Sequence, residues 1–443
     1  MIFFALSFGG LTARAEPLAT NLTPDSAVLI AVNENRDLIA ARFAVRQAEG
    51  RLLQAGLWPN PEFELARQRD TAFGNEGEYN LSAGFKQRFP ITGRLQKARN
   101  VARVDVAMAA AEIRNQERLL IGEVLGRARE LQVLREQLNI NSEIQKTLQQ
   151  LVDVSEKRLK AAETSEADVN LAKLELQKVI LSRATLLTEE DTAKVELNRL
   201  MGRAPQSPIE IIGTYNIEID LNALSDAMRR AVPNRPDRQL AALAINHAAA
   251  EIKLARAQKW EDWTVGFGYS RDNQVFKKPI GDKVDQFLGL SVSIPLPLFN
   301  KNQGRIQEAQ AAEERAQAEL SALELRILAQ LQAAKNQMAR LLTVLRQYRE
   351  ESITLAEKNV ALLQQGYANG LANITAVIQA QQQLTDLRVL LLQATRNLLR
   401  IQIEFETGAA SSSFLQQPAN SEKMNESVPS NSQSRQPRNP SIP

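Results

Sequence analysis

Two segments of the chain alternate strictly between large apolar residues and small or polar ones. They are LGLSVSI, residues 288–294, and TVGFGYS, residues 264–270. Successive side chains of a strand point to opposite faces, so both segments are predicted to be strands with one apolar face. The side chains expected on that face, where they would contact lipid if the sheet lies in a membrane, include Val265, Phe267, Leu288, Leu290 and Val292.

The first half of the chain holds a second pair of strand patterns. Residues 79–89, YNLSAGFKQRF, alternate well, whereas residues 62–69 alternate only in part. The segments that join the strands of each pair, 70–78 and 272–286, are polar and carry Gly, Asn or Lys, as exposed hairpin loops do. The chain therefore contains two predicted β-hairpins.

Each hairpin ends at a proline-marked corner that leads into a helical pattern. The corners read FPITGR in the first half and IPLPLFNKNQGR in the second. Proline removes a backbone donor and disfavours helix in the residue before it, so each strand is expected to stop there. The two corners share one design, which is the first sign of a duplication.

Beyond each corner, apolar residues recur at spacings of three and four, the pattern of a coiled-coil seam. The seam of the second half runs from Leu320 to Tyr348, and a looser version begins at Ile121. A continuous helix over residues 94–162 would be about 100 Å long. The expected turns are at 161–165 and 368–373, and the expected return helices are 166–200 and 374–406.

The beginnings of the two halves align at a fixed offset. One helix is predicted to run from Pro24 past Leu52, and its counterpart begins near Leu221. Asp37 aligns with Asp237, and several neighbouring positions align at the same offset of 200 residues, which indicates an internal repeat. The predicted organisation is a signal peptide at 1–15, a first repeat at 16–203, a second repeat at 204–408 and a disordered tail at 409–443.

The two ends of the chain and its charge pattern indicate its cellular compartment and limit the kinds of partner it can bind. An apolar run at 2–11 precedes Ala13-Arg14-Ala15, a small-x-small cleavage pattern, so export is expected. The tail is rich in Ser, Asn, Gln and Pro and cannot bury enough surface to offset the entropy of ordering. The 54 basic and 51 acidic residues are interspersed, so no nucleic-acid partner is expected.

The residue types needed for catalysis or cofactor binding are missing or isolated. The chain has no cysteine and one histidine, His247, so no thiolate site and no metal site are expected. A hydrolase triad would have only that histidine as its base, and the sequence shows no nucleophile elbow and no phosphate-binding glycine loop. We expect no enzyme activity and no cofactor.

Strands of this kind fit either the wall of an outer-membrane barrel or a soluble sheet. The helices between them are far too long for the loops of a sandwich. Four strands cannot close a barrel in lipid, where an open edge would leave backbone groups without partners. The pattern favours a barrel shared by several copies. A soluble sheet capping a non-conducting periplasmic coiled-coil scaffold is the alternative.

Tryptophans lie near the ends of the predicted strands. Trp58 precedes the first strand, and Trp260 and Trp263 precede the third. They either anchor a barrel at the lipid interface or pack where helix meets sheet.

The order of two strands, a FPITGR or IPLPLFNKNQGR corner, a long helical hairpin and a second copy resembles the TolC-like outer membrane efflux protein family, over about residues 20–408. The segment LWPNPEFELARQRD, 57–70, is most similar to its heavy-metal-cation efflux branch. The resemblance implies a mainly helical chain that forms a homotrimer, with four strands per chain in a shared transmembrane barrel and helices that form a periplasmic tunnel. It implies a passive exit duct in the bacterial outer membrane, docked through a periplasmic adaptor protein to an inner-membrane transporter.

The resemblance also assigns roles to residues near the two helical turns. In the family, adaptor-docking turns carry an aromatic residue or Leu, then Gly or Ala, then a polar residue, at intervals of three. The matching positions are Leu159, Ala162 and Ser165 in the first turn and Tyr367, Gly370 and Asn373 in the second. An ordinary polar helix turn is the alternative.

Just past the turn, family members carry an Asp-Val-Leu-Asp-Ala run whose carboxylates ring the closed end of the tunnel. Here Ala376 and Gln379 replace both carboxylates of the second half, whereas the first half keeps Asp168. These three residues are the gate candidates, with a plain exposed helix carboxylate as the alternative for Asp168. Residues 366–379 carry fewer large apolar side chains than the seam, so we expect this end to be the mobile gate and the barrel end to be fixed.

Overall fold

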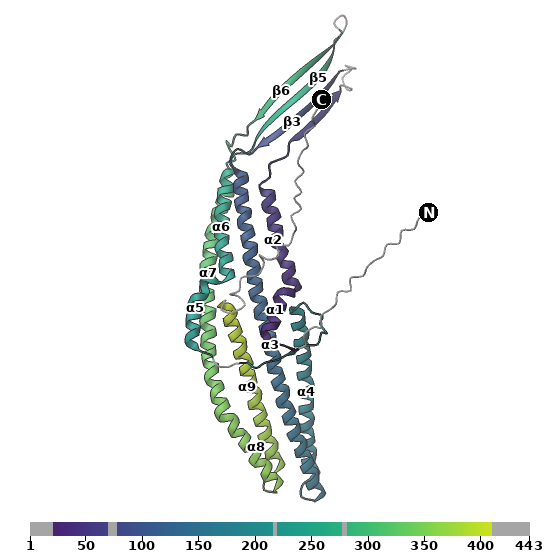
Figure 1. Ribbon diagram of the computed structural model, residues 1–443, viewed down its shortest axis with the longest axis vertical. Helices are drawn as coiled ribbons and strands as arrows, with labels where there is room; N and C mark the ends of the chain where they lie inside the picture. The colour runs from purple at the N-terminus through teal and green to yellow at the C-terminus, as the bar shows by residue number, and fades with distance from the viewer. Residues whose placement is uncertain (1–20, 70–77, 216–218, 277–280, 410–443) are drawn as a thin grey trace, which may run out of the picture.

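The computed structural model describes residues 21–69, 78–215, 219–276 and 281–409. These residues form an elongated body with a β-sheet at one end and long helices that run away from it to two turns at the other end (Figure 1). The predicted signal peptide lies outside the described residues, as does the predicted tail from residue 410 onward.

The same order of a helix pair, two strands and a long helical hairpin occurs twice along the chain. The helices of the first half are α1 (Pro24–Glu34), α2 (Arg36–Ala55), α3 (Arg94–Lys160) and α4 (Glu166–Leu200). Those of the second half are α5 (Leu221–Asn234), α6 (Pro236–Ala257), α7 (Gln303–Gln347), the π-helix η1 (Tyr348–Ser352), α8 (Ile353–Ala368) and α9 (Ile374–Gly408). The strands are β2 (Glu62–Arg69), β3 (Tyr79–Phe89), β5 (Trp263–Phe276) and β6 (Gly281–Ser293), with a short parallel pair, β1 (Asn21–Leu22) and β4 (Glu210–Ile211).

The main sheet is antiparallel, with the strand order β2-β3-β5-β6. Its register places four large apolar residues side by side across all four strands: Phe63, Phe85, Phe267 and Leu290. The next row on the opposite face holds Glu64, Gly84, Gly268 and Gly289. The sheet therefore has one apolar and one small or charged face, as the alternation predicted.

The second hairpin is longer than the sequence predicted. Residues 272–286 were expected to form a loop, but β5 continues to Phe276 and β6 begins at Gly281. Polar pairs such as Gln274 opposite Lys283 lie in this extension. The expectation was wrong because ladder hydrogen bonds join backbone groups and do not need an apolar face.

The long helices pack around three main clusters of buried side chains. The cluster below the sheet in the second half contains Ile327, Leu331, Met338 and Leu345, four residues of the predicted seam. The helix that carries this seam is interrupted by η1, in which no residue is buried. The sequence did not predict this interruption, because its residues fit an ordinary helix equally well.

The first helix was predicted to be continuous, but it breaks at Asn35. The Asn35 side chain accepts a hydrogen bond from the Leu38 amide (2.8 Å) and donates one to the carbonyl oxygen of Leu200 (2.8 Å). The same side chain thus caps the start of α2 and the end of α4. Arg235, 200 residues later, breaks the second helix and donates to the carbonyl oxygen of Gly408 (2.9 Å). Each break therefore holds the last turn of the return helix in its own half.

A glycine beside the first break makes this packing testable. Gly202 has φ +74°, and a Cβ atom there would lie 2.1 Å from the carbonyl oxygen of Glu34, whereas exposed Gly50 has nothing within 4 Å. We expect Gly202→Ala to cost about 2–4 kcal/mol and Gly50→Ala to be neutral or stabilising by up to about 1 kcal/mol. The melting temperature, followed by the loss of helical circular dichroism on heating, measures the stability of both variants. Equal melting of the two variants would contradict the contact.

Candidate functional site

The apolar face of the sheet is uncovered within the chain. Leu290 is 75% exposed and Phe267 is 52% exposed, and Leu288 and Val292 are exposed as well, while Val265 is half-buried. The register brings all five predicted residues onto this face. A continuous apolar surface of this kind marks a contact with lipid or with another chain. The opposite face carries ion pairs between Lys86 and Glu64 (2.6 Å) and between Arg88 and Glu62 (2.6 Å).

The two helical turns at the far end share one backbone geometry. Ala162 has φ +59° and Gly370 has φ +74°, and each is followed three residues later by the residue that caps the next helix. The Ser165 hydroxyl accepts from the Asp168 amide (3.2 Å), and the Asn373 side chain accepts from the Ala376 amide (2.8 Å). The predicted spacing of three is therefore a helix stop followed by a helix start, and Gly370 is such a stop.

The two turns are held to each other by one arginine. Arg158, near the end of α3, donates to the carbonyl oxygen of Tyr367 (2.6 Å) and lies 4.6 Å from the centre of its ring. A common apolar cluster, which includes Leu151, Leu176, Tyr367, Ile374 and Val377, fills the space between the hairpins. Tyr367 is 3% exposed, while Leu159, its counterpart, is half-buried. The expectation that this end is poorly packed was wrong, because residues spread along the sequence converge there.

The three gate candidates have different environments. Asp168 completes the capping box of α4, since its carboxylate accepts from the Thr164 hydroxyl (2.8 Å) and from the Ser165 amide (3.3 Å). These hydrogen bonds, first that of Thr164, lower the pKa of Asp168. At pH values above the ordinary aspartate pKa, the ionised carboxylate therefore stabilises the cap. This stabilisation is lost as the pH falls through the lowered pKa of Asp168. Gln379 is exposed, and Ala376 is half-buried.

The tryptophans and the histidine occupy surface positions near packed neighbours. Trp58 meets Phe89 edge to face, with the ring centres 6.1 Å apart, yet it is 60% exposed. Trp260 and Trp263 are exposed too. His247 pairs with Asp105 (3.0 Å), and the described residues contain no cluster of His, Asp or Glu that could hold a metal ion.

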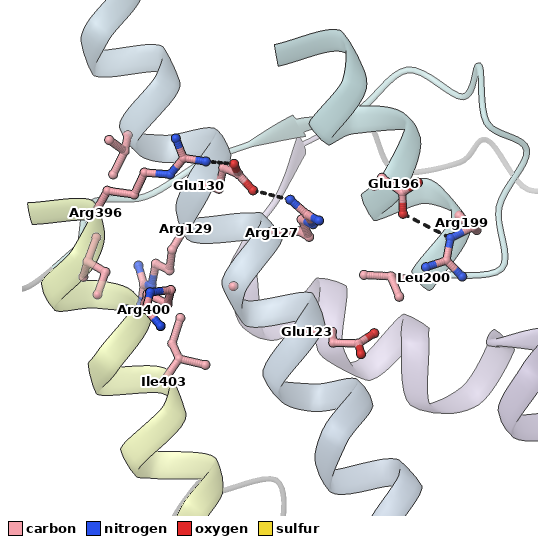
Figure 2. Close-up of a pocket in the computed structure, with 13 residues that line it drawn as sticks. Glu123, Arg127, Arg129, Glu130, Glu196, Arg199, Leu200, Arg396, Arg400 and Ile403 are labelled. Carbon is pink, nitrogen blue, oxygen red and sulfur yellow. Dashed lines mark hydrogen bonds and ion pairs between the residues drawn. The ribbon is translucent and has the colours of Figure 1, made fainter. Parts of the chain in front are cut away.

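Sequence reasoning missed a groove of about 530 Å³ between α3, the end of α4 and α9. Figure 2 shows that Arg396 and Arg127 both point to Glu130, while Arg199 pairs with Glu196 (3.1 Å). Its lining contains five arginines and three glutamates but no Ser, His or Asp that could act as a nucleophile or base. The groove joins residues from three distant segments, so no local motif could predict it. The ion pair of Arg396 with Glu130 joins α9 to α3, whereas the other two pairs lie within single helices.

No described helix is both long and apolar enough to cross a membrane.

The family model described as outer membrane efflux protein matches residues 29–203 and 227–407. The chain belongs to this family. It is 22% identical over 372 residues to the cobalt-zinc-cadmium resistance protein CzcC of Cupriavidus metallidurans, covering 83% of this chain and 85% of the relative. It is 26% identical over 322 residues to the pyoverdine export outer membrane protein OpmQ of Pseudomonas putida, covering 67% of this chain and 65% of that one.

Solved structures of outer-membrane channels have the same fold. The CusC channel superposes with a TM-score of 0.68 at 17% identity, over 87% of this chain and 92% of CusC. The outer membrane protein VceC of Vibrio cholerae gives 0.67 at 18% identity, over 87% and 95% of the two chains. As an outer membrane efflux protein, the chain is the outer-membrane channel of a tripartite efflux system, with its helices in the periplasm. The family and the function as an outer-membrane channel of a tripartite efflux system, both expected from the resemblance, are confirmed, and the scaffold alternative is wrong.

The shared turn geometry gives a reciprocal prediction. A residue with a Cβ atom is strained at positive φ by about 1 kcal/mol, so Ala162→Gly should stabilise the first turn, and Gly370→Ala should destabilise the second. Amide hydrogen exchange resolved at 155–170 and 362–378 measures each turn separately. Faster exchange in the first turn of Ala162→Gly would contradict the assignment.

Proposed function

We propose that the chain works as a homotrimeric, passive exit duct that performs no catalysis, docked by a periplasmic adaptor and supplied by an inner-membrane transporter. The observation that carries the proposal is the apolar face of the four-stranded sheet, which is continuous across all strands and ends at two open edges. Membership of the efflux family supports it, because a channel without a motor needs an energy source in a partner.

The open edges favour several copies in one barrel. Strands β2 and β6 each have a pairing partner on one side only within the described sheet. In lipid, each unpaired backbone group costs several kcal/mol, so β6 of one copy must pair with β2 of the next. The helices also favour contact between copies, because three of their leucines, Leu325, Leu355 and Leu362, are each about 70% exposed. Twelve strands from three copies would close the wall.

The five residues Val265, Phe267, Leu288, Leu290 and Val292 would then face lipid, and the Gly and Ser residues between them would face the lumen. This assignment follows the rule that strands of membrane barrels alternate apolar outside and polar inside. The ion pairs of Lys86 and Arg88 lie on the lumen side in this arrangement.

The adaptor would dock at the paired turns. Leu159, Ala162 and Ser165 and their counterparts Tyr367, Gly370 and Asn373 fix the shape of the two turns through backbone conformation and caps. The rigid geometry of both turns supports recognition of their shape, because a preorganised surface loses little entropy on binding.

The gate would lie at this same end, where Arg158 links the hairpins. Exposed Gln379, rather than a carboxylate, would line the constriction with Ala376, and Asp168 would act as a cap. An adaptor that prefers the separated hairpins would shift the equilibrium towards the open state. The two curated relatives are named for different cargoes, so we place cargo choice in the transporter.

Lipid exposure predicts a difference between two adjacent residues. Leu290→Arg would place a charge on the lipid face, at a cost of about 2–4 kcal/mol near mid-bilayer, whereas Ser291→Arg would point to the lumen. We expect the first variant to fail in membrane insertion and trimer assembly and the second to insert. Membrane fractionation measures insertion, and electrophoresis of unheated samples measures trimer assembly. Normal insertion of Leu290→Arg would contradict a lipid-facing sheet.

The hairpin link predicts the behaviour of the gate. Arg158→Ala removes a hydrogen bond and a ring contact between the hairpins, while Lys157→Ala removes the same charge from an exposed position one residue away. Single-channel recording in planar bilayers should show a larger open fraction for Arg158→Ala and no change for Lys157→Ala. Equal open fractions in both variants would place the gate elsewhere.

A further inference from the structure

A shallow cationic depression lies where the helices meet the sheet. It has a volume of about 370 Å³ and lies between the start of α3 and the last turns of α6, close to the ends of β3 and β5. Three of its six lining residues are cations, and none is acidic. The lining residues are Thr92, Lys97, Lys253, Arg256, Ala257 and Trp260.

Among the described residues, the three cations have no anionic partner. The Lys97 ammonium donates to the carbonyl oxygen of Thr92 (2.9 Å), and within the described part of the chain no carboxylate pairs with Lys97, Lys253 or Arg256. Nearby Arg94, in contrast, pairs with Asp262. Like charges gathered around one depression repel each other unless an anion lies between them. The arrangement therefore suits an anionic ligand.

The depression lies beside the first turn of α3, whose N-cap makes no side-chain hydrogen bond. Its N-cap is Gly93, at φ +64°, which has no side chain to accept from the first amides, and the first turn contains no acidic residue. The start of a helix carries a partial positive charge and free N–H groups, which bind phosphate well. The buried Thr92 hydroxyl also has no hydrogen-bond partner in the structure. The Thr92 residue, two lysines and one arginine thus line a depression at the start of α3.

The position of the depression identifies the source of the phosphate. Lys97 lies one helical turn into α3, about 5 Å from its start, directly below the sheet. Trp260 is 42% exposed, and Phe299 at the neighbouring proline corner is 93% exposed. Exposed aromatic residues beside cations are typical of the headgroup region of a membrane, whereas a water-filled lumen disfavours them. If the apolar sheet face contacts lipid, the depression lies at the level of the periplasmic leaflet's headgroups.

We propose that this depression binds the phosphate of an anionic phospholipid from the periplasmic leaflet of the outer membrane. Lys97, Lys253 and Arg256 hold the phosphate, and the Trp260 indole packs against the glycerol and the upper part of the acyl chain. The inference rests on the proposed function only in that the apolar sheet face contacts lipid. Such a bound lipid fixes the height of the channel in the membrane at the junction of barrel and helices.

Lipid titration of the purified full-length channel in detergent tests the site. Native mass spectrometry compares dioleoyl phosphatidylglycerol with dioleoyl phosphatidylcholine, for the wild type, Lys253→Gln/Arg256→Gln and the control Lys157→Gln/Lys160→Gln at the helix tip. Each cation near an anionic lipid is worth about a fivefold change in affinity, so the first variant should bind phosphatidylglycerol about 25-fold more weakly. The wild type and the control should bind it equally and prefer it to phosphatidylcholine.

Two results would overturn the proposal. One is equal binding of phosphatidylglycerol by the wild type and Lys253→Gln/Arg256→Gln. The other is displacement of the lipid by inorganic phosphate at the same concentration, which would make the depression a site for free anions. Because this titration needs no membrane insertion, its failure is distinct from a failure of the lipid-facing sheet.

Trp260 fluorescence tests which side of the wall the depression faces. In the Trp58→Phe/Trp263→Phe background, reconstituted into phosphatidylglycerol vesicles, Trp260 is the sole indole. A nitroxide near the headgroup of the lipid should quench it, and iodide in the water should not. Quenching by iodide alone would place the depression in the lumen and would overturn the proposal.

Discussion

Backbone hydrogen bonding at the edges of a four-stranded sheet is the constraint on which this channel depends. Within the described residues, β2 and β6 each present one row of unpaired groups, and the sheet face beside them is apolar. Water would satisfy those groups but not the apolar face, and lipid would do the reverse. Pairing between copies satisfies both, because the edges close on each other while the apolar face turns outward.

In the helical part, the shorter entry helices and the return helices α4 and α9 must be held against helices about 100 Å long. Asn35 and Arg235, 200 residues apart, each break a helix and bind the final carbonyl groups of a return helix. Arg118 adds a bond to the carbonyl oxygen of Thr407 (3.3 Å), and burial lowers its pKa. The hairpins are therefore anchored near their middle, and at their tips they are linked by Arg158 and by the apolar cluster around Tyr367.

Local patterns predicted the parts of the fold that local physics decides. Alternation in LGLSVSI and the proline corners located the strands, and the turn expected at 368–373 is confirmed, since α8 ends at Ala368 and α9 begins at Ile374. The extension of β5 to Phe276, the break at Asn35 and the link between Arg158 and Tyr367 could not be predicted this way. The break at Asn35 and the Arg158 link depend on partners far along the chain, 165 and 209 residues away. The β5 extension pairs with nearby residues of β6, but at polar positions such as Gln274 and Lys283 that show no apolar alternation.

The shared wall is tested most directly by disulfide trapping between sheet edges. The chain has no native cysteine, and β2 and β6 lie at opposite edges of the sheet in one copy, so a bond between them must join two copies. Cysteines at alternate positions of β2, each combined with alternate positions of β6, are oxidised in membranes and separated by non-reducing electrophoresis. A shared barrel predicts covalent products of two and three chains, and none larger. Monomers alone, or ladders beyond three chains, would contradict it.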